Sequence, residues 1–132
     1  MVLGSAQGVG NQEEHMAKGF SMILGVVLLA VGVVGMVTGG HNHDLIIFGI
    51  NLTHNIVHVL SGVLALAAAM AGEKAAKMYC LVFGAVYGIV TVAGFISLAP
   101  VVDLLNLNMA DNVLHLAIAG ACLYVGAQSK TA

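Results

Sequence analysis

Charged residues are scarce in this chain of 132 residues: they make up 8% of the sequence, and four lysines supply all of its fixed positive charge. In an ordinary soluble domain about a quarter of the residues are charged. So few charges cannot cover a water-exposed surface, and the basic patch that neutralises nucleic-acid phosphates is missing. These absences exclude a soluble enzyme, a disordered chain and a nucleic-acid binder.

Cysteine is also rare. Cys80 and Cys122 both lie within apolar runs and form no CxxC motif, so neither a disulfide scaffold nor a zinc knuckle is indicated. Apolar residues, in contrast, are abundant, at 60% of the chain with a mean hydropathy of +1.02. Soluble domains have roughly 45–50% apolar residues. The composition therefore predicts an integral membrane protein whose surroundings are the lipid bilayer.

Four segments reach the length of about 20 mostly apolar residues that a transmembrane helix needs. We therefore predict an all-α fold, a four-transmembrane-helix bundle, in which Pro100 stops the third span. A polar cytoplasmic tail at 1–17 precedes the membrane domain at 18–132. The predicted spans are 20–38, 53–71, 78–99 and 110–127.

The positions of the lysines predict the orientation. Lysines lie before the first span, between the second and third, and after the fourth, which is one side of the membrane for an even number of spans. The positive-inside rule then puts both termini in the cytoplasm. The two outer connections contain apolar stretches at 45–50 and 101–107. Each is expected to be either a helix in the membrane interface or an extension of the following span.

The second and fourth spans open on similar polar motifs. Asn-Leu-Thr-His-Asn-Ile-Val-His occupies 51–58, and Asn-Met-Ala-Asp-Asn-Val-Leu-His occupies 108–115, at a constant offset of 57 residues. We therefore predict two helical-hairpin repeats, at about 18–72 and 77–129, inserted in the same direction. Parallel repeats are related by an axis along the membrane normal, so the two motifs are expected at equivalent positions.

The motifs resemble those of a family of small four-span bacterial membrane proteins, catalogued as domain of unknown function 4383. The resemblance covers about residues 19–126. It implies a four-helix membrane fold in a bacterial inner membrane, but no particular activity, because none is assigned to the family. It also implies importance for six residues of the motifs: His54, Asn55, His58, Asp111, Asn112 and His115.

A metal site is one interpretation of these polar residues. Because side chains four residues apart share a helix face, His54 and His58 project together, and so do Asp111 and His115. Polar groups inside a membrane bundle are costly and mark functional sites. Three imidazoles and one carboxylate suit Zn²⁺ or Cu²⁺, so these four residues are the predicted ligands. Two asparagines would orient the ligands through hydrogen bonds, Asn55 and Asn112.

A haem or a chlorophyll-type pigment is the alternative cofactor. His58 and His115 occupy equivalent positions in the two repeats, and paired histidines on facing helices ligate haem axially. Such a protein would serve electron transfer or light harvesting. This interpretation leaves His54 and Asp111 without a role, and the chain has no arginine to pair with haem propionates.

The polar cluster also fits a structural role, as a clamp between spans. Hydrogen bonds between transmembrane helices contribute about 0.6 kcal/mol on average, and up to about 1–2 kcal/mol. In that case Thr53 would cap the second span and Asp111 the fourth. The sequence thus favours a non-enzymatic membrane protein whose cluster, in the outer half of the bilayer, binds a metal or clamps the bundle. An enzyme is the third alternative, since a metal-dependent hydrolase or desaturase could use a His/Asp site next to lipid, but three histidines and one aspartate are few for a di-iron centre. Its low charge and many glycines suit a homo-oligomer or an accessory subunit of a larger membrane complex.

Overall fold

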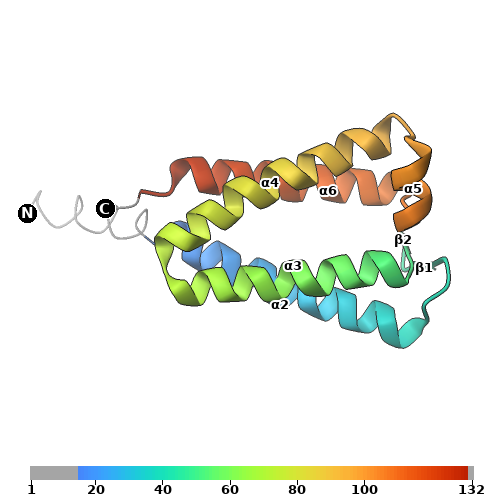
Figure 1. Ribbon diagram of the computed structural model, residues 1–132, viewed down its shortest axis with the longest axis horizontal. Coiled ribbons are helices and arrows are strands. Elements are labelled where there is room, and N and C mark those ends of the chain that lie inside the picture. The colour runs from blue at the N-terminus through green and yellow to red at the C-terminus, as the bar shows by residue number, and fades with distance from the viewer. Residues whose placement is uncertain (1–14, 131–132) are drawn as a thin grey trace, which may run out of the picture.

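The computed structural model describes residues 15–130, and within that range four helices are long and apolar enough to cross a membrane. These helices are α2 (Met16–Thr38), α3 (Leu52–Ala71), α4 (Glu73–Phe95) and α6 (Met109–Gln128). They form two hairpins, in which α2 packs along α3 and α4 packs along α6 (Figure 1). The predicted four-helix membrane fold is confirmed. Of the predicted tail, residues 1–14 lie outside the described residues, and its last two residues already belong to α2.

The two outer connections have different structures. Residues 45–50, expected as an interfacial helix or an extension of the next span, instead form most of an antiparallel β-hairpin. Its strands are β1 (His43–Leu45) and β2 (Phe48–Ile50), and a two-residue turn joins them. The stretch at 101–107 lies largely in a separate short helix, α5 (Ala99–Leu105), which breaks off before α6 begins.

The third span ends four residues earlier than predicted. Helix α4 stops at Phe95, and Pro100 is not its terminator but a residue of the first turn of α5. Proline is tolerated in the first turn of a helix because the amide it lacks would have no partner within the helix. The break between the two helices is made instead by Ser97, whose φ of 55° is incompatible with a continuing helix.

The predicted helix caps are displaced by a few residues. At the start of α3, the Asn51 side chain rather than that of Thr53 accepts a hydrogen bond, from the His54 amide at 2.9 Å. At the start of α6, Asn108 accepts from the Asp111 amide at 2.9 Å, and Asp111 accepts in return from the Asn108 amide at 2.9 Å. This reciprocal pair is a capping box, so Asp111 does contribute to the cap but is not the cap residue.

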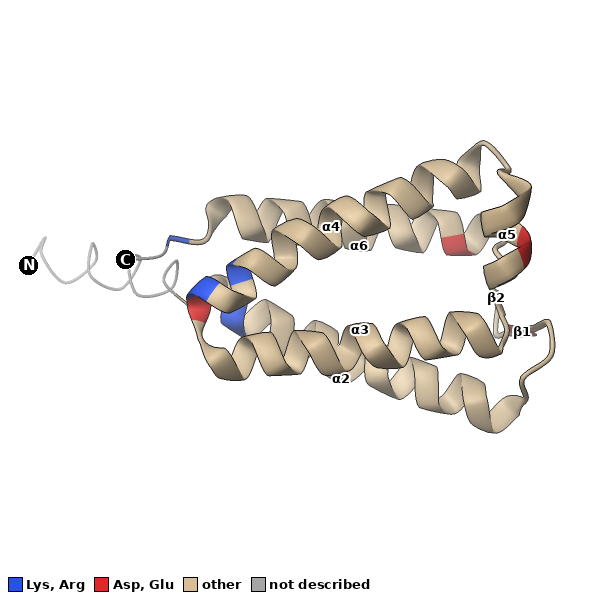
Figure 2. Cartoon of the chain, in the orientation of Figure 1, with Lys and Arg blue, Asp and Glu red and all other residues tan. Residues whose placement is uncertain are grey.

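The lysines gather at one end of the bundle, where the described part of the chain begins and ends (Figure 2). There the carboxylate of Glu73 accepts hydrogen bonds from the amides of Ala17 and Lys18, at 2.8 and 2.9 Å. A negative charge satisfies the free amides of a helix N-terminus and complements its dipole, so Glu73 caps α2 from across the bundle. Ser129 donates to the same carboxylate and its carbonyl accepts from Lys77, which ties the end of α6 to α4.

A single glycine makes the turn between α3 and α4. Gly72 has φ 124° and ψ −179°, a conformation that is essentially restricted to glycine. We expect Gly72→Ala to lower the free energy of unfolding by about 1–3 kcal/mol, although no atom would contact the added methyl. Thermal unfolding in detergent, followed by the reaction of buried Cys80 and Cys122 with a thiol-reactive dye, measures this loss. The control is Gly88→Ala, also in open space but helical, which should be neutral or slightly stabilising.

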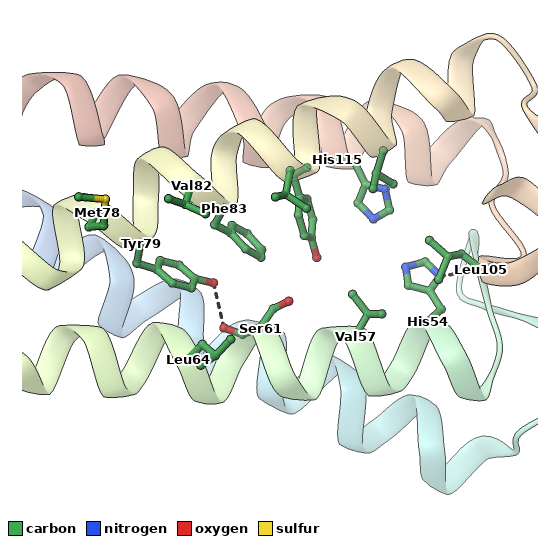
Figure 3. A pocket seen from close by; sticks show the side chains of 13 residues that line it. His54, Val57, Ser61, Leu64, Met78, Tyr79, Val82, Phe83, Leu105 and His115 are labelled. Carbon is green, nitrogen blue, oxygen red and sulfur yellow. Dashed lines mark hydrogen bonds between the residues drawn. The ribbon is translucent and has the colours of Figure 1, made fainter.

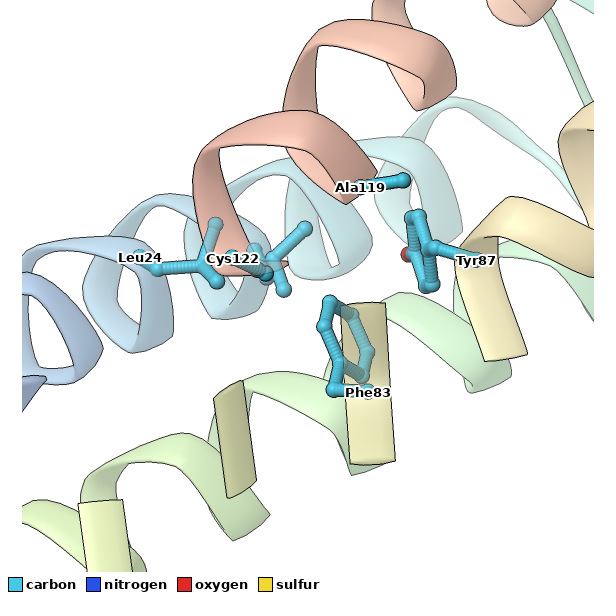
Figure 4. Close-up of a cluster of buried hydrophobic side chains, with 6 residues drawn as sticks. Leu24, Phe83, Tyr87, Ala119 and Cys122 are labelled. Carbon is cyan, nitrogen blue, oxygen red and sulfur yellow. The ribbon is translucent and has the colours of Figure 1, made fainter. Parts of the chain in front are cut away.

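Apolar side chains cover the outside of the bundle. Val37, Met70 and Ile89 expose 82%, 79% and 71% of their surface, as expected for side chains that face lipid. Small and aromatic residues pack in the interior, where α2, α4 and α6 meet in one hydrophobic cluster (Figure 4). Its buried members are Leu24, Leu28, Phe83, Tyr87, Ala119 and Cys122.

Candidate metal centre

Three buried histidines meet near the end of the bundle opposite the lysines. His54 and His58 lie one turn apart on α3, and His115 projects toward them from α6; their exposed fractions are 1%, 6% and 3%. The ring centroids are 4.4 Å apart for His54 and His58, 5.5 Å for His54 and His115, and 6.3 Å for His58 and His115. One ligand atom from each residue lies within 4.8 Å of the other two. The predicted convergence of these three side chains is therefore present.

A hydrogen bond sets the tautomer of His54. Its Nδ1 lies 2.9 Å from the carbonyl oxygen of Leu105, which only accepts, so Nδ1 carries the proton. In a neutral imidazole the other nitrogen, Nε2, then carries a lone pair and can accept a hydrogen bond or bind a metal. A backbone carbonyl that holds Nδ1–H in this way is the usual support for a histidine that binds a metal through Nε2.

The cluster contains buried nitrogen atoms without partners. Counting the atoms of residues 15–130, His54 Nε2, His58 Nδ1 and both ring nitrogens of His115 are buried without a hydrogen bond. Buried polar atoms are nearly always hydrogen-bonded, and an unpaired one costs about 1–3 kcal/mol. Four such atoms in one place make this cluster the candidate site in the described part of the chain.

Asp111 lies on the same helix face as His115, but its carboxylate has other partners. One oxygen, Oδ2, accepts from the Gly49 amide at 3.0 Å and from the Asn108 amide at 2.9 Å. It is not among the ligand atoms that converge with the histidines in the described residues. Asp111 therefore joins the β-hairpin to the start of α6, which leaves the three imidazoles as the convergent donors.

Further polar side chains fasten this end of the bundle. Asn51 donates to the Leu104 carbonyl at 3.0 Å, and Asn106 donates to the Ile50 carbonyl at 3.0 Å. Asn108 donates to the Ile47 carbonyl at 2.9 Å. These bonds connect the β-hairpin, α5 and the starts of α3 and α6, whereas the clamp considered in the sequence analysis joined the second and fourth spans directly. The sequence analysis did not predict this role for the asparagines, because their partners are backbone carbonyls of α5 and of the β-hairpin, which no sequence spacing identifies.

The two asparagines predicted to orient the ligands, Asn55 and Asn112, face glycines of the neighbouring helix. A methyl group added at Gly35 of α2 would overlap the Asn55 side chain, and one added at Gly94 of α4 would overlap that of Asn112. Asn55 and Asn112 are 0% and 5% exposed, and within the described chain neither Asn55 amide atom nor the Asn112 Oδ1 has a hydrogen-bond partner. Each asparagine thus sits at the interface of its own hairpin.

An apolar cavity of about 450 Å³ adjoins the histidines (Figure 3). His54 and His115 face each other at one end of it, and the Tyr79 hydroxyl donates to the Ser61 carbonyl at 2.8 Å nearer the other. Helices α3 and α4 supply most of its lining. Several lining side chains are also exposed on the outside of the bundle, so the cavity opens toward lipid; among them are Leu64, Met78, Val82 and Val86.

Taken together, four apolar spanning helices around buried polar side chains define an integral membrane protein of the helical-bundle class. The sequence model of a domain of unknown function (DUF4383) matches residues 18–128, which is most of the chain. The chain belongs to this family, as its motifs led us to expect. No match was found among curated proteins, and none among solved structures.

Proposed function

We propose that this protein binds one transition-metal ion, Zn²⁺ or copper, through His54, His58 and His115. The single observation that carries the proposal is the convergence of three buried imidazoles that have unpaired nitrogens. Imidazole is a good ligand for both metals, and three histidines with one open position form a recognised zinc arrangement. Asp111, which the sequence analysis placed among the ligands, has a structural role in this proposal.

The spacing of the donors favours a small ion. In a tetrahedral site, zinc–nitrogen bonds of about 2.0–2.1 Å place two ligand nitrogens about 3.3–3.4 Å apart, which is closer than the present limit of 4.8 Å. The imidazoles would therefore have to move closer together, by rotation of their side chains, to complete the site. The lone pair of His54 is already directed by the bond from Nδ1 to Leu105, so this residue would need the least reorganisation.

The spacing also argues against haem between His58 and His115. The two rings are 6.3 Å apart, but the His54 ring lies 4.4 and 5.5 Å from them. It therefore occupies space beside the line between the two rings, where a macrocycle plane would extend. The unpaired imidazole nitrogens also disfavour a purely structural clamp, because a clamp would hold the helices together through hydrogen bonds to these nitrogens.

The proposed setting follows from the lysines. By the positive-inside rule, the lysine end faces the cytoplasm of a bacterial cell, which puts both termini there and the histidines in the outer half of the inner membrane. We propose a non-enzymatic role, as a homo-oligomer or an accessory subunit of a larger membrane complex. Support comes from the apolar sides of the spanning helices and from Gly88 among their residues, where an added methyl would have open space around it.

Metal analysis of protein purified without an affinity tag tests the proposal. We expect about one zinc or copper ion per chain, and its removal by a chelator should lower the unfolding temperature. Adding the metal back should restore the original unfolding temperature, because a ligand that binds only the native state stabilises that state. Absence of stoichiometric metal, together with no stabilisation by either added ion, would contradict the proposal. A Soret absorption band in the same sample would favour haem instead.

A further inference from the structure

The cavity beside the histidines has a wall of aromatic rings that the metal site does not use. Tyr79, Phe83 and Tyr87 follow one another at four-residue intervals along α4. Their ring centroids are 4.9 Å apart for the first pair and 4.1 Å for the second. His115 continues the row, with its ring 5.2 Å from that of Tyr87. A continuous row of rings offers stacking surface to another flat ring.

The polar groups of the cavity are concentrated at its histidine end. His54 Nε2 carries a lone pair, and His115 has one ring nitrogen that donates and one that accepts, all without partners in the described chain. The lining residues include no lysine, aspartate or glutamate. This end is therefore suited to a neutral head that carries oxygen atoms, and it is poorly suited to a phosphate or a free carboxylate.

The rest of the cavity is apolar and suits a hydrocarbon chain rather than a polar group. Its side between α3 and α4 is lined by aliphatic residues that are half exposed to the membrane, such as Val82 and Val86 at 55% and 51%. A long hydrocarbon chain attached to the head could leave the cavity here without crossing a polar surface. A volume of about 450 Å³ is within the range of pockets that hold small organic ligands.

We propose that the cavity binds a lipid-soluble quinone or quinol, with its ring against Phe83 and Tyr87 and its oxygens toward His54 and His115. A quinol hydroxyl would donate to the His54 lone pair, and the His115 N–H would donate to a ring oxygen. The tail would pass between α3 and α4 into the bilayer. This inference goes beyond the metal site and needs no metal for binding. Because the quinol hydroxyl would use the His54 lone pair that a metal would otherwise occupy, metal and quinol would bind in alternation.

Photolabelling in lipid vesicles tests the inference, with an azido-benzoquinone that carries a decyl tail. We expect the label on α3 and α4 peptides that border the cavity, within 57–64 and 79–87, and at least a tenfold reduction by excess decyl-benzoquinone. Val86→Trp, which fills the cavity, should reduce labelling similarly. Its control, Val92→Trp, changes an equally exposed valine of α4 that does not line this cavity, and it should label like the original protein.

Two results would overturn the inference. One is displacement of the label by oleate as effective as that by the quinone, since the cavity would then be a general crevice for acyl chains. The other is label spread over the lipid-facing surface and unaffected by Val86→Trp. Metal content measured on the same samples separates the two proposals. Absence of specific labelling after the metal has been removed by a chelator contradicts only the quinone site, and specific labelling of protein that binds no added metal contradicts only the metal site.

Discussion

Replacing His115 with glutamine is expected to lower metal affinity by more than about 100-fold. Even the loss of a group that merely orients a ligand costs 10–100-fold, and here one of three ligands would be lost. His58→Gln should have a similar effect from the other helix. Metal titration of the purified variants, followed by mass spectrometry of the metal that remains bound, measures the change. Retention of stoichiometric metal in both variants would contradict the proposed ligand set.

Asp111→Ala is the matched control on the same face of α6. It removes the acceptor for the Gly49 and Asn108 amides, so it should lower the free energy of unfolding by about 1–3 kcal/mol. Metal stoichiometry should stay unchanged, because the carboxylate does not converge with the imidazoles. If this variant lost its metal as His115→Gln does, the four-ligand site predicted from the sequence would replace the three-histidine site.

Replacing Gly62 with valine is expected to have the largest effect on stability. A side-chain carbon at this position of α3 would lie 2.7 Å from the Leu29 amide nitrogen and 2.8 Å from the Gly25 carbonyl oxygen. Both atoms belong to the backbone of α2, so no side chain can move aside and the two helices must separate. Overpacking of a core lowers the free energy of unfolding by about 1–3 kcal/mol, and for Gly62→Val we expect a loss at or above the upper end of this range. Close packing at glycine is a main source of helix association in membranes.

Gly120→Val provides the comparison, because it places the same residue within a spanning helix, α6, where no atom lies within 4 Å of the added carbon. The difference between the two variants isolates the contact with α2, since the helix propensity of valine affects both equally. Thermal unfolding, read through the reaction of the two buried cysteines with a dye, gives this difference. Equal stability of the two variants would show that the contact does not hold the hairpin together.

The spans were predictable because length and hydropathy alone determine which segments can cross a bilayer. The β-hairpin was not, since its turn falls on Ile46 and Ile47 and lacks the asparagine or glycine that signals a two-residue turn. Ile46 instead adopts a φ of 62°, which is unusual for a branched side chain. An apolar run at this point of the sequence therefore looked like part of a helix.

The candidate site was predictable in part, for a similar reason. Spacing by four residues identifies a shared helix face, and it correctly grouped His54 with His58. It does not identify partners, so it also grouped Asp111 with His115, although the carboxylate is held by amides at the start of its own helix and in the hairpin. The predicted duplication of the hairpins stays a prediction, although the pairing of Asn55 with Gly35 and of Asn112 with Gly94 is consistent with it.

X-ray absorption spectroscopy of the metal-loaded protein tests the central claim most directly. The account predicts three imidazole ligands at about 2.0–2.1 Å for zinc, with the remaining position taken by a light atom such as oxygen. The imidazole signal should be lost in His115→Gln and kept in Asp111→Ala. A spectrum dominated by sulfur at about 2.3 Å would place the metal on the cysteines, and it would contradict the three-histidine site.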